Sequence, residues 1–146
     1  MKQDAFIFDI DGTLANNDHR LHYILNKPKD YDKFYAESIN DDVYKDVARI
    51  LDMCNRDFSK IIIVTGRPEE YRGMCEEWFK KHFIYYQTMY MRQTGDYRKD
   101  YIVKKEIYET QIKDKYNILG VFEDRNDCVQ MWRELGLTCF QPKVTE

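Results

Sequence analysis

The alternation of short apolar runs with amphipathic segments constrains the fold of this 146-residue chain more than any other feature. Apolar runs typical of buried strands occupy residues 5–9, 60–65, 87–91, 118–122 and 138–140. Strands of a parallel sheet are covered on both faces, so they read as continuous apolar runs. Helices between successive strands supply that cover. The pattern therefore predicts an α/β fold with a central parallel sheet flanked by helices.

Four segments carry apolar residues at helical spacing. They span residues 43–58, 71–82, 103–116 and 128–135, and their apolar stripes are expected to pack into the core. Gly136 follows the last stripe and is placed to end that helix in a left-handed cap. No repeat, low-complexity tract or interdomain linker is visible, so we expect a single domain over residues 1–146.

Cysteine usage and hydropathy indicate the compartment. The four cysteines lie far apart, form no CxxC pair and mostly occupy apolar periodic segments, where cysteine packs as a small hydrophobe. No leader-like segment opens the chain, and no apolar run reaches the length of a membrane-spanning helix. We therefore expect a soluble protein of the reducing cytoplasm that has no membrane partner.

Charge gives only a local hint of nucleic-acid binding. The formal net charge is -3, so the overall electrostatic field of the protein does not favour binding of a polyanion such as a nucleic acid. A basic cluster is formed by Arg92, Arg98, Lys99, Lys104 and Lys105. Such a cluster has two interpretations, a nucleic-acid contact or a solvated helix face.

Residues 16–42 do not fit the alternating pattern. This segment is polar, contains Pro28 and lacks a sustained period. Because it directly follows the first predicted strand, it is expected to lie over the carboxyl end of that strand, where open α/β sheets bind their ligands. Two interpretations remain: a cap or flap that covers the substrate, and a simple surface loop.

Two aspartates follow the first predicted strand. Asp9 and Asp11 precede Gly12, which indicates that the chain is turning, so both carboxylates can converge beyond the sheet. The alternative is an Asp-Gly hairpin turn without chemistry.

The ends of two other predicted strands carry polar groups as well. The second strand ends in Thr65, Gly66 and Arg67, with Pro68 placed as the first residue of the following helix. A hydroxyl, backbone amides near a helix start and a guanidinium outline a site for an oxyanion. A simple helix cap explains the threonine and the proline but not the arginine.

The fourth predicted strand ends in Glu123 and Asp124, and Asp127 follows one helical turn later. Acids at a helix start also complement the helix dipole, so one of them could be structural. Carboxylates gathered at one sheet edge repel one another unless a cation neutralises them, and oxygen-only ligands suit Mg²⁺. A magnesium ion also screens a phosphate from an attacking carboxylate, so the combination points to phosphoryl transfer.

The motifs "DIDGT", "TGR", a later lysine and "EDRND" occur in the order found in the haloacid dehalogenase superfamily of phosphotransferases, which the sequence resembles over almost its whole length. It looks closer still to the 3′-phosphatase domain of the bacteriophage polynucleotide kinase/phosphatase family. The segments that carry this closer resemblance are "GDYRKDYIVKKEIY", "EDRNDCVQMWRELGLTCFQ" and Arg20, nine residues after Asp11. The resemblance implies a Rossmann-like sheet.

The resemblance also implies catalytic roles. Asp9 would attack phosphorus and form an aspartyl-phosphate, and Asp11 would act as acid and then as base. We expect crowding beside Asp9 to raise the pKa of Asp11. Thr65 would hold a phosphoryl oxygen, and Lys104 would neutralise the nucleophile and the phosphate, with Asp100 one turn earlier on the helix to orient it.

Metal and substrate ligands follow from the same resemblance. Asp9, Asp124 and the main-chain carbonyl of Asp11 would bind Mg²⁺. The family commonly has a pair of aspartates where this chain has Glu123 and Asp124, which puts the geometry of the metal site in question. The substrate-binding candidates are Arg20, Gly66, Arg67, Arg92 and Asp100.

Three functions remain open. The first is a Mg²⁺-dependent phosphatase for 3′-phosphates on nucleic-acid ends or nucleotides, and the second is a related phosphatase for a sugar phosphate or 5′-nucleotide. The third is a phosphate-accepting signalling domain, against which Asp11 argues because an acid/base beside the nucleophile promotes turnover. No GxxxxGK[ST] loop occurs, so we expect phosphatase activity alone, with any kinase or ligase on a separate partner.

Overall fold

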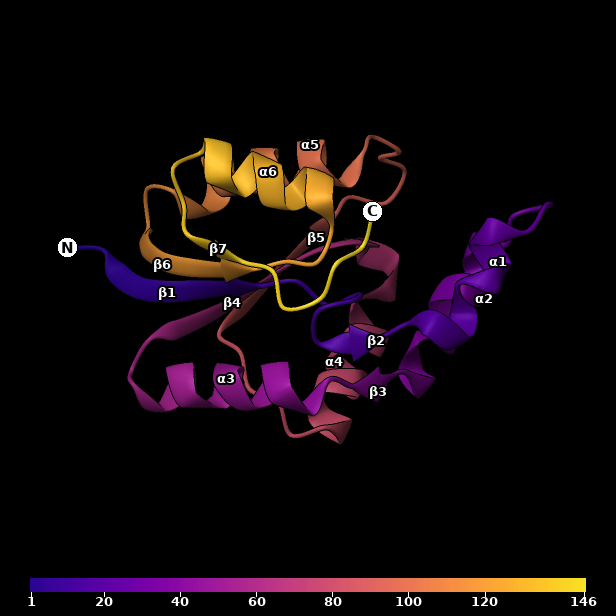
Figure 1. The fold of residues 1–146 in the computed structure, drawn as a ribbon, viewed down its shortest axis with the longest axis horizontal. Coiled ribbons are helices and arrows are strands. Elements are labelled where there is room, and N and C mark those ends of the chain that lie inside the picture. Colours follow the sequence, from indigo (N-terminus) through magenta and orange to yellow (C-terminus); the bar gives the residue numbers. More distant parts are fainter.

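The computed structural model describes all residues from Met1 to Glu146 and centres on a five-stranded parallel sheet (Figure 1). The strands lie in the order β5 (Thr88–Arg92), β4 (Lys60–Pro68), β1 (Gln3–Phe8), β6 (Tyr116–Phe122) and β7 (Cys139–Phe140). β1 occupies the centre, where Phe8 pairs with Ile63 of β4 and with Phe122 of β6. The α/β fold and the parallel sheet are therefore as predicted.

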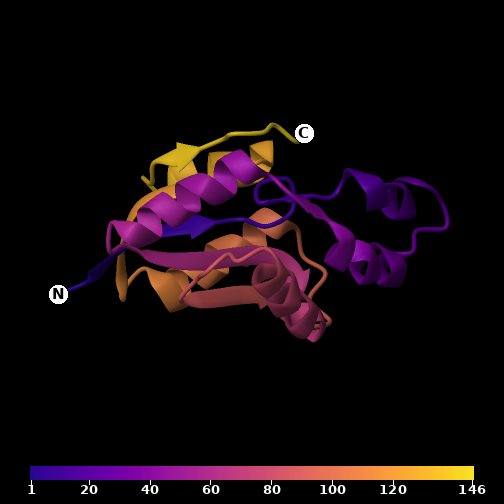
Figure 2. The same ribbon diagram turned by 90° about the horizontal axis from the view of Figure 1, so that it is seen from below.

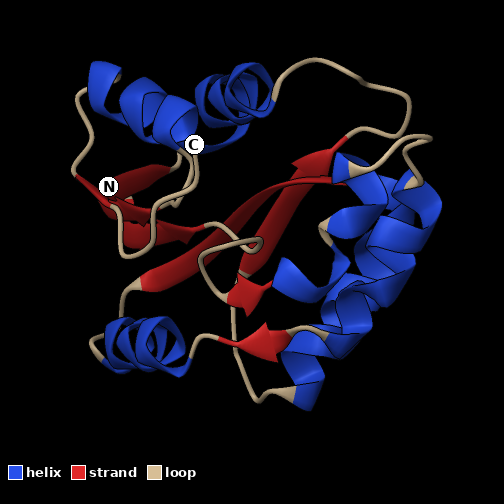
Figure 3. Ribbon diagram, turned by 45° about the vertical axis from the view of Figure 1, so that its right-hand side comes forward, coloured by secondary structure: helices blue, strands red, loops and turns tan.

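Helices cover both faces of the sheet. On one face lie α3 (Lys45–Arg56) and α4 (Arg72–Lys81), and on the other lie α5 (Asp100–Ile107), the π-helical turn η4 (Tyr108–Ile112) and α6 (Asn126–Glu134) (Figures 1 and 3). Successive side chains of β1 enter opposite cores: Phe8 packs with Trp78 of α4, whereas Ile7 packs with Trp132 of α6. This double burial explains the apolar strand runs.

Several element boundaries differ from the predictions. Pro68 does not begin a helix: it ends β4, the short helix η3 (Glu69–Tyr71) follows it, and α4 begins at Arg72. Tyr116 begins β6 rather than extending the preceding helix. The first long helix ends at Arg56, and Phe58 lies beyond it with a φ of 65°.

The cap of the last helix agrees with the prediction. Gly136 follows α6 with a φ of 83°, in the left-handed region that glycine adopts without strain.

The insertion is folded rather than an irregular loop. Its stem is an antiparallel pair of short strands, β2 (Ala15–Asn16) and β3 (Asp42–Val43). Between them lie η1 (Asp18–Arg20), α1 (His22–Leu25), α2 (Tyr31–Ala36) and η2 (Glu37–Asn40). In Figure 2 the helices α1 and α2 project from the body of the domain. The stem follows β1, so the insertion lies at the carboxyl edge of the sheet.

Buried residues anchor the insertion to the body. The side chain of Phe34 is buried, and the Ser38 hydroxyl lies 3.3 Å from the sulfur of Met74 on α4. No helix in the structure has both the length and the apolar character needed to cross a membrane.

Candidate active site

Three carboxylates meet where β1 and β6 end. Asp9 follows β1, Glu123 and Asp124 follow β6, and one carboxylate oxygen of each lies within 4.8 Å of the others. All three residues are buried. Lys104 of α5 contacts two of them, with Nζ 2.9 Å from Asp9 Oδ1 and 2.7 Å from Glu123 Oε2. We call these four residues the acid cluster.

Gly12 and Thr13, which follow Asp11 in the sequence, lie against the acid cluster. Gly12 has a φ of 82°, and a Cβ atom there would collide with the Asp124 carboxylate. The buried Thr13 hydroxyl lies 3.3 Å from Asp9 Oδ2 and 3.2 Å from Asp124 Oδ1. Thr13 was not a predicted site residue, although its place in the "DIDGT" motif could have indicated it.

The acid cluster has less positive charge than negative charge. Burial, followed by repulsion from Glu123, raises the pKa of Asp9 well above its ordinary value. Burial alone would lower the pKa of Lys104, but attraction to Asp9 and Glu123 outweighs it and the net shift is upward. One ammonium group cannot balance three carboxylates. The buried, oxygen-only donor set therefore fits a small divalent cation.

Asp11 lies in different surroundings, facing two buried arginines. Arg67, near the end of β4, donates from Nε to Asp11 Oδ2 at 3.1 Å and from Nη2 to Oδ1 at 2.7 Å, and Arg20 Nη2 also donates to Oδ1. Burial opposes ionisation of Asp11, but the two guanidiniums more than offset it and hold the pKa well below the ordinary range. The expected rise in the Asp11 pKa is therefore wrong, because these cations outweigh any crowding by Asp9.

A fourth residue ties the two arginines together. Asp41, at the end of the insertion, accepts from Arg20 Nε at 2.8 Å and Nη2 at 2.7 Å, and Arg67 Nη2 lies 3.5 Å away. His19 Nε2 lies 2.7 Å from Asp41 Oδ1, and the Trp78 indole donates to the Asp41 carbonyl at 2.9 Å. We call Asp11, Asp41, Arg20 and Arg67 the arginine cluster.

Sequence reasoning missed Asp41 for a physical reason. It lies 30 residues from Asp11 beside the equally acidic Asp42, and only the folded insertion distinguishes the buried carboxylate from the exposed one. No motif or spacing marks it.

Thr65, Gly66 and Arg67 lie near the carboxyl end of β4. Thr65 is fully buried, and its hydroxyl accepts from the backbone N–H of Arg67 at 3.2 Å. A Cβ atom at Gly66 would collide with the Asp100 carboxylate, so only glycine lets these two segments approach so closely.

Asp100 and Arg92 bind each other rather than the partners expected. Arg92 is buried: it donates to Asp100, to the Gly66 carbonyl at 2.8 Å, and to carbonyls of the loop after β5. Asp100 Oδ2 also lies 3.6 Å from Arg125 Nη1. The expected orientation of Lys104 by Asp100 is not seen, because Lys104 pairs with the acid cluster. Arg92 thus stabilises the loop after β5.

The remaining charged groups do not add to the site. Asp127 accepts from the Cys128 backbone N–H at 2.8 Å and pairs with Arg125, which is a helix-start role outside the acid cluster. Most of the predicted basic cluster is neutralised, since Arg98 pairs with Asp96 and Glu106 and Lys104 is buried. These pairs favour the interpretation without a nucleic-acid contact.

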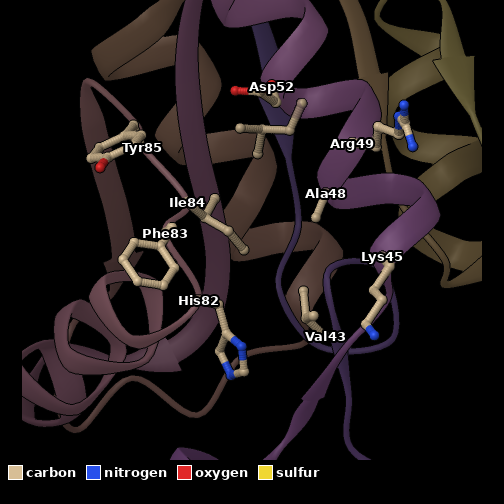
Figure 4. A pocket seen from close by; sticks show the side chains of 10 residues that line it. Val43, Lys45, Ala48, Arg49, Asp52, His82, Phe83, Ile84 and Tyr85 are labelled. Atoms are coloured by element: carbon tan, nitrogen blue, oxygen red, sulfur yellow. The ribbon is translucent and has the colours of Figure 1, made fainter.

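A cavity of about 340 Å³ lies elsewhere, between α3 and the segment after α4 (Figure 4). Its lining includes Val43, Leu51, His82 and Ile84 but no member of the acid cluster or the arginine cluster. The candidate site at the carboxyl edge of the sheet is therefore separate from this cavity.

The parallel sheet, the aspartates after its central strand and the buried lysine beside them define a phosphatase domain of the haloacid dehalogenase superfamily. A solved haloacid dehalogenase-like hydrolase from Streptococcus pneumoniae has this fold, with a TM-score of 0.63 at 14% identity over 95% of this chain and 84% of that one. More specifically, the model of the polynucleotide kinase PNKP phosphatase domain matches residues 3–146, and the chain belongs to that family.

Two relatives are more similar in sequence. A chain in the "Structure of Pnkp1/Rnl/Hen1 complex" superposes with a TM-score of 0.87 at 36% identity, covering 99% of this chain and 47% of that one. The "Putative bifunctional polynucleotide kinase/RNA ligase" of Autographa californica nuclear polyhedrosis virus is 31% identical over 135 residues, which are 91% of this chain and 18% of the viral protein. The chain thus spans less than half of either relative.

Proposed function

We propose that the domain removes 3′-phosphates from nucleic-acid ends or 3′-nucleotides through an aspartyl-phosphate on Asp9. The observation that carries the proposal is the match of residues 3–146 to the PNKP phosphatase family. The convergence of Asp9, Asp11, Thr65 and Lys104 on one sheet edge supports it, because each role that the reaction requires has a side chain there.

In the first step, a carboxylate oxygen of Asp9 bonds to phosphorus while the bond from phosphorus to the ribose oxygen breaks. Asp11 transfers a proton to that departing oxygen. In the second step, water attacks the phosphorus, Asp11 takes up a proton from the water, and the Asp9 carboxylate leaves with inorganic phosphate as the product. Lys104 neutralises Asp9 throughout, and Thr65 donates to a phosphoryl oxygen.

The acid role of Asp11 requires a change from the arrangement described above, in which both guanidiniums face its carboxylate. A phosphate offers oxygens that match the forked donors of arginine. We infer that the arriving phosphate competes for Arg20 and Arg67, weakens their hold on Asp11 and lets Asp11 carry the proton.

Mg²⁺ is the proposed metal, held by Asp9, Asp124 and the main-chain carbonyl of Asp11. Glu123 would not bind the metal directly, because its oxygens already lie 2.7 Å from Lys104 Nζ and 3.2 Å from the Asp124 backbone nitrogen. When bound, the ion supplies positive charge that lets a phosphate approach the negative Asp9.

Two further proposals concern the surroundings of the site. The insertion at 16–42 serves as a cap, since it supplies Arg20 and Asp41 to the arginine cluster. A kinase or ligase acts with this domain, as the names of the two relatives suggest. Four free cysteines support the proposed cytoplasmic location.

A substrate panel tests the proposal. Matched oligonucleotides with 3′- or 5′-phosphates, mononucleotides and a sugar phosphate are incubated with and without Mg²⁺, and phosphate release is measured. We expect release from 3′-phosphates only when Mg²⁺ is present. Equal rates on every compound would favour a general phosphatase, whereas a long-lived phosphorylated protein without turnover would favour the signalling domain.

A further inference from the structure

A row of three tyrosines lies at the junction between the insertion and the body of the domain. Tyr31 and Tyr35 lie on α2, and Tyr71 ends η3, shortly after β4. The ring centroids of Tyr35 and Tyr71 are 4.7 Å apart with planes inclined by 30°, and those of Tyr31 and Tyr35 are 6.4 Å apart at 28°. We call these three residues the tyrosine row.

The tyrosine row is continuous with the arginine cluster. Arg20, which donates to Asp11, also donates from Nη1 to the Phe34 carbonyl at 3.2 Å and lies 4.4 Å from the centre of the Phe34 ring. The Phe34 ring meets Tyr35 edge-on, with centroids 5.1 Å apart. After burial, the charges of Asp11 and Asp100 raise the pKa of the Tyr35 hydroxyl, so this phenol lies within electrostatic reach of the site.

Hydrogen bonds fix the tyrosine row while leaving part of it open. The Ser38 hydroxyl donates to the Tyr35 carbonyl at 2.6 Å, and the Tyr71 hydroxyl lies 3.2 Å from Asp32 Oδ1. Tyr31 is 49% exposed, and Tyr35 and Tyr71 are half-buried. A fixed aromatic surface that is partly open to solvent loses little conformational freedom when a ligand stacks on it.

The chemistry of this surface suits a nucleobase. Bases of every identity stack on aromatic side chains, because each base has a π face, whereas a sugar phosphate offers no such face. Arg20, which links the tyrosine row to the site, already donates to Asp11 and Asp41, so it is poorly suited to reading base edges.

Resting on the proposed 3′-phosphatase function, we propose that the tyrosine row is a stacking subsite for the base of the 3′-terminal nucleotide, while the phosphate lies at Asp9. The domain then selects base-bearing 3′-phosphates over base-free ones, with little preference among the bases. The competing explanation is a clasp, in which the rings only join the insertion to the body.

The test compares two trinucleotides that both carry a 3′-phosphate, one ending in thymidine and one ending in a base-free tetrahydrofuran residue. We expect the wild-type protein to prefer the base-bearing substrate by about tenfold in kcat/KM, the size typical of one stacked base. Tyr35→Leu and Tyr71→Leu should each reduce this preference to about twofold and act mainly through KM. Tyr35→Phe keeps the ring and should keep the preference.

Tyr85→Leu is the matched control, because Tyr85 is 69% exposed and lies in the segment before β5, away from the tyrosine row. Its preference should equal that of the wild type. Equal losses on both substrates in the Tyr35 and Tyr71 variants would indicate the clasp and overturn the subsite. If the wild-type protein has nearly equal kcat/KM values on the two substrates, the subsite proposal is wrong but the proposed 3′-phosphatase function is unaffected. Failure of the wild type to release phosphate from either substrate would remove the proposed function itself, and the subsite with it.

Discussion

The acid cluster and the arginine cluster lie at the same sheet edge, yet they shift the pKa values of their aspartates in opposite directions. In the acid cluster three carboxylates share the single ammonium of Lys104, and the pKa of Asp9 is raised. In the arginine cluster two carboxylates face two guanidiniums, and the pKa of Asp11 is lowered. Only Ile10 separates these aspartates in the sequence, so the balance of nearby charge decides the direction in which the pKa of each one shifts.

The two clusters also differ in their balance of positive and negative charge. The acid cluster lacks positive charge, which is the condition under which carboxylates bind a divalent ion. The arginine cluster is neutral as it stands, and in the proposed mechanism an arriving phosphate changes that balance by competing for the guanidiniums.

Asp9→Asn should reduce kcat for 3′-phosphate release by about 10⁴-fold or more, because an amide is a poor nucleophile. Acid quenching of the wild-type reaction should trap a phosphorylated protein that the variant does not form. The matched control is Asp4→Asn, which makes the same change at an exposed residue outside the site. Near-normal turnover by Asp9→Asn would exclude the covalent mechanism.

Lys104→Met should lower the free energy of unfolding by about 3–5 kcal/mol at pH 7, because it leaves three buried carboxylates without their only cation. Urea unfolding with and without Mg²⁺ measures the loss, and Mg²⁺ should restore part of it. Lys105→Met, an exposed neighbour whose Nζ lies 3.8 Å from Glu109, should change stability little. Indifference of the Lys104 variant to Mg²⁺ would argue against a metal site in the acid cluster.

Asp11→Asn should slow release of phosphate from a ribose 3′-oxygen by about 10²–10³-fold, since this poor leaving group needs a proton. Release from an activated aryl phosphate should fall far less, because its leaving group departs unprotonated. The ratio of kcat values on the two substrates measures the effect. Similar losses on both would contradict the acid role.

Asp41→Asn should destabilise the domain by about 2 kcal/mol, because charged hydrogen bonds to Arg20 are replaced by weaker ones. Asp42→Asn is the matched control, since it makes the same change at the exposed neighbour and should have an effect near zero. Thermal unfolding of both variants measures the difference. Equal stability of the two variants would mean that Asp41 does not hold the arginine cluster together.

The pH dependence of the metal-free protein should separate the two clusters. The folded-state pKa of Asp9 lies above its ordinary value of 3.8, so the folded state retains a proton and the free energy of unfolding should rise as pH falls from 7 towards 5. The slope should be at most about 1.4 kcal/mol per pH unit for one proton. The pKa of Asp11 is depressed, so its stabilisation is present above about pH 4 and is lost below it.

Urea titrations in EDTA across this range measure that slope, and Asp9→Asn should flatten it. A wild-type stability that instead falls steadily from pH 7 to 5 would contradict the difference between the two clusters.

Local sequence patterns were informative for those structural features that a short stretch of chain determines. The parallel sheet, the placement of Asp9 and Thr65 near the carboxyl ends of β1 and β4, and the cap at Gly136 follow from periodicity and residue type within a few positions. The insertion was harder to predict, because its helices α1 and α2 have 4 and 6 residues, too few to display a period.

The sequence by itself determined the α/β fold and the sheet edge that carries the acids, because apolar runs must be buried and parallel strands end at one edge. Only the tertiary structure decided which charges meet there: that Asp41 joins Arg20 and Arg67, that Arg92 binds Asp100, and that the pKa of Asp11 falls. Electrostatic interactions act over a few ångströms of space, and packing of the insertion against the body sets those distances.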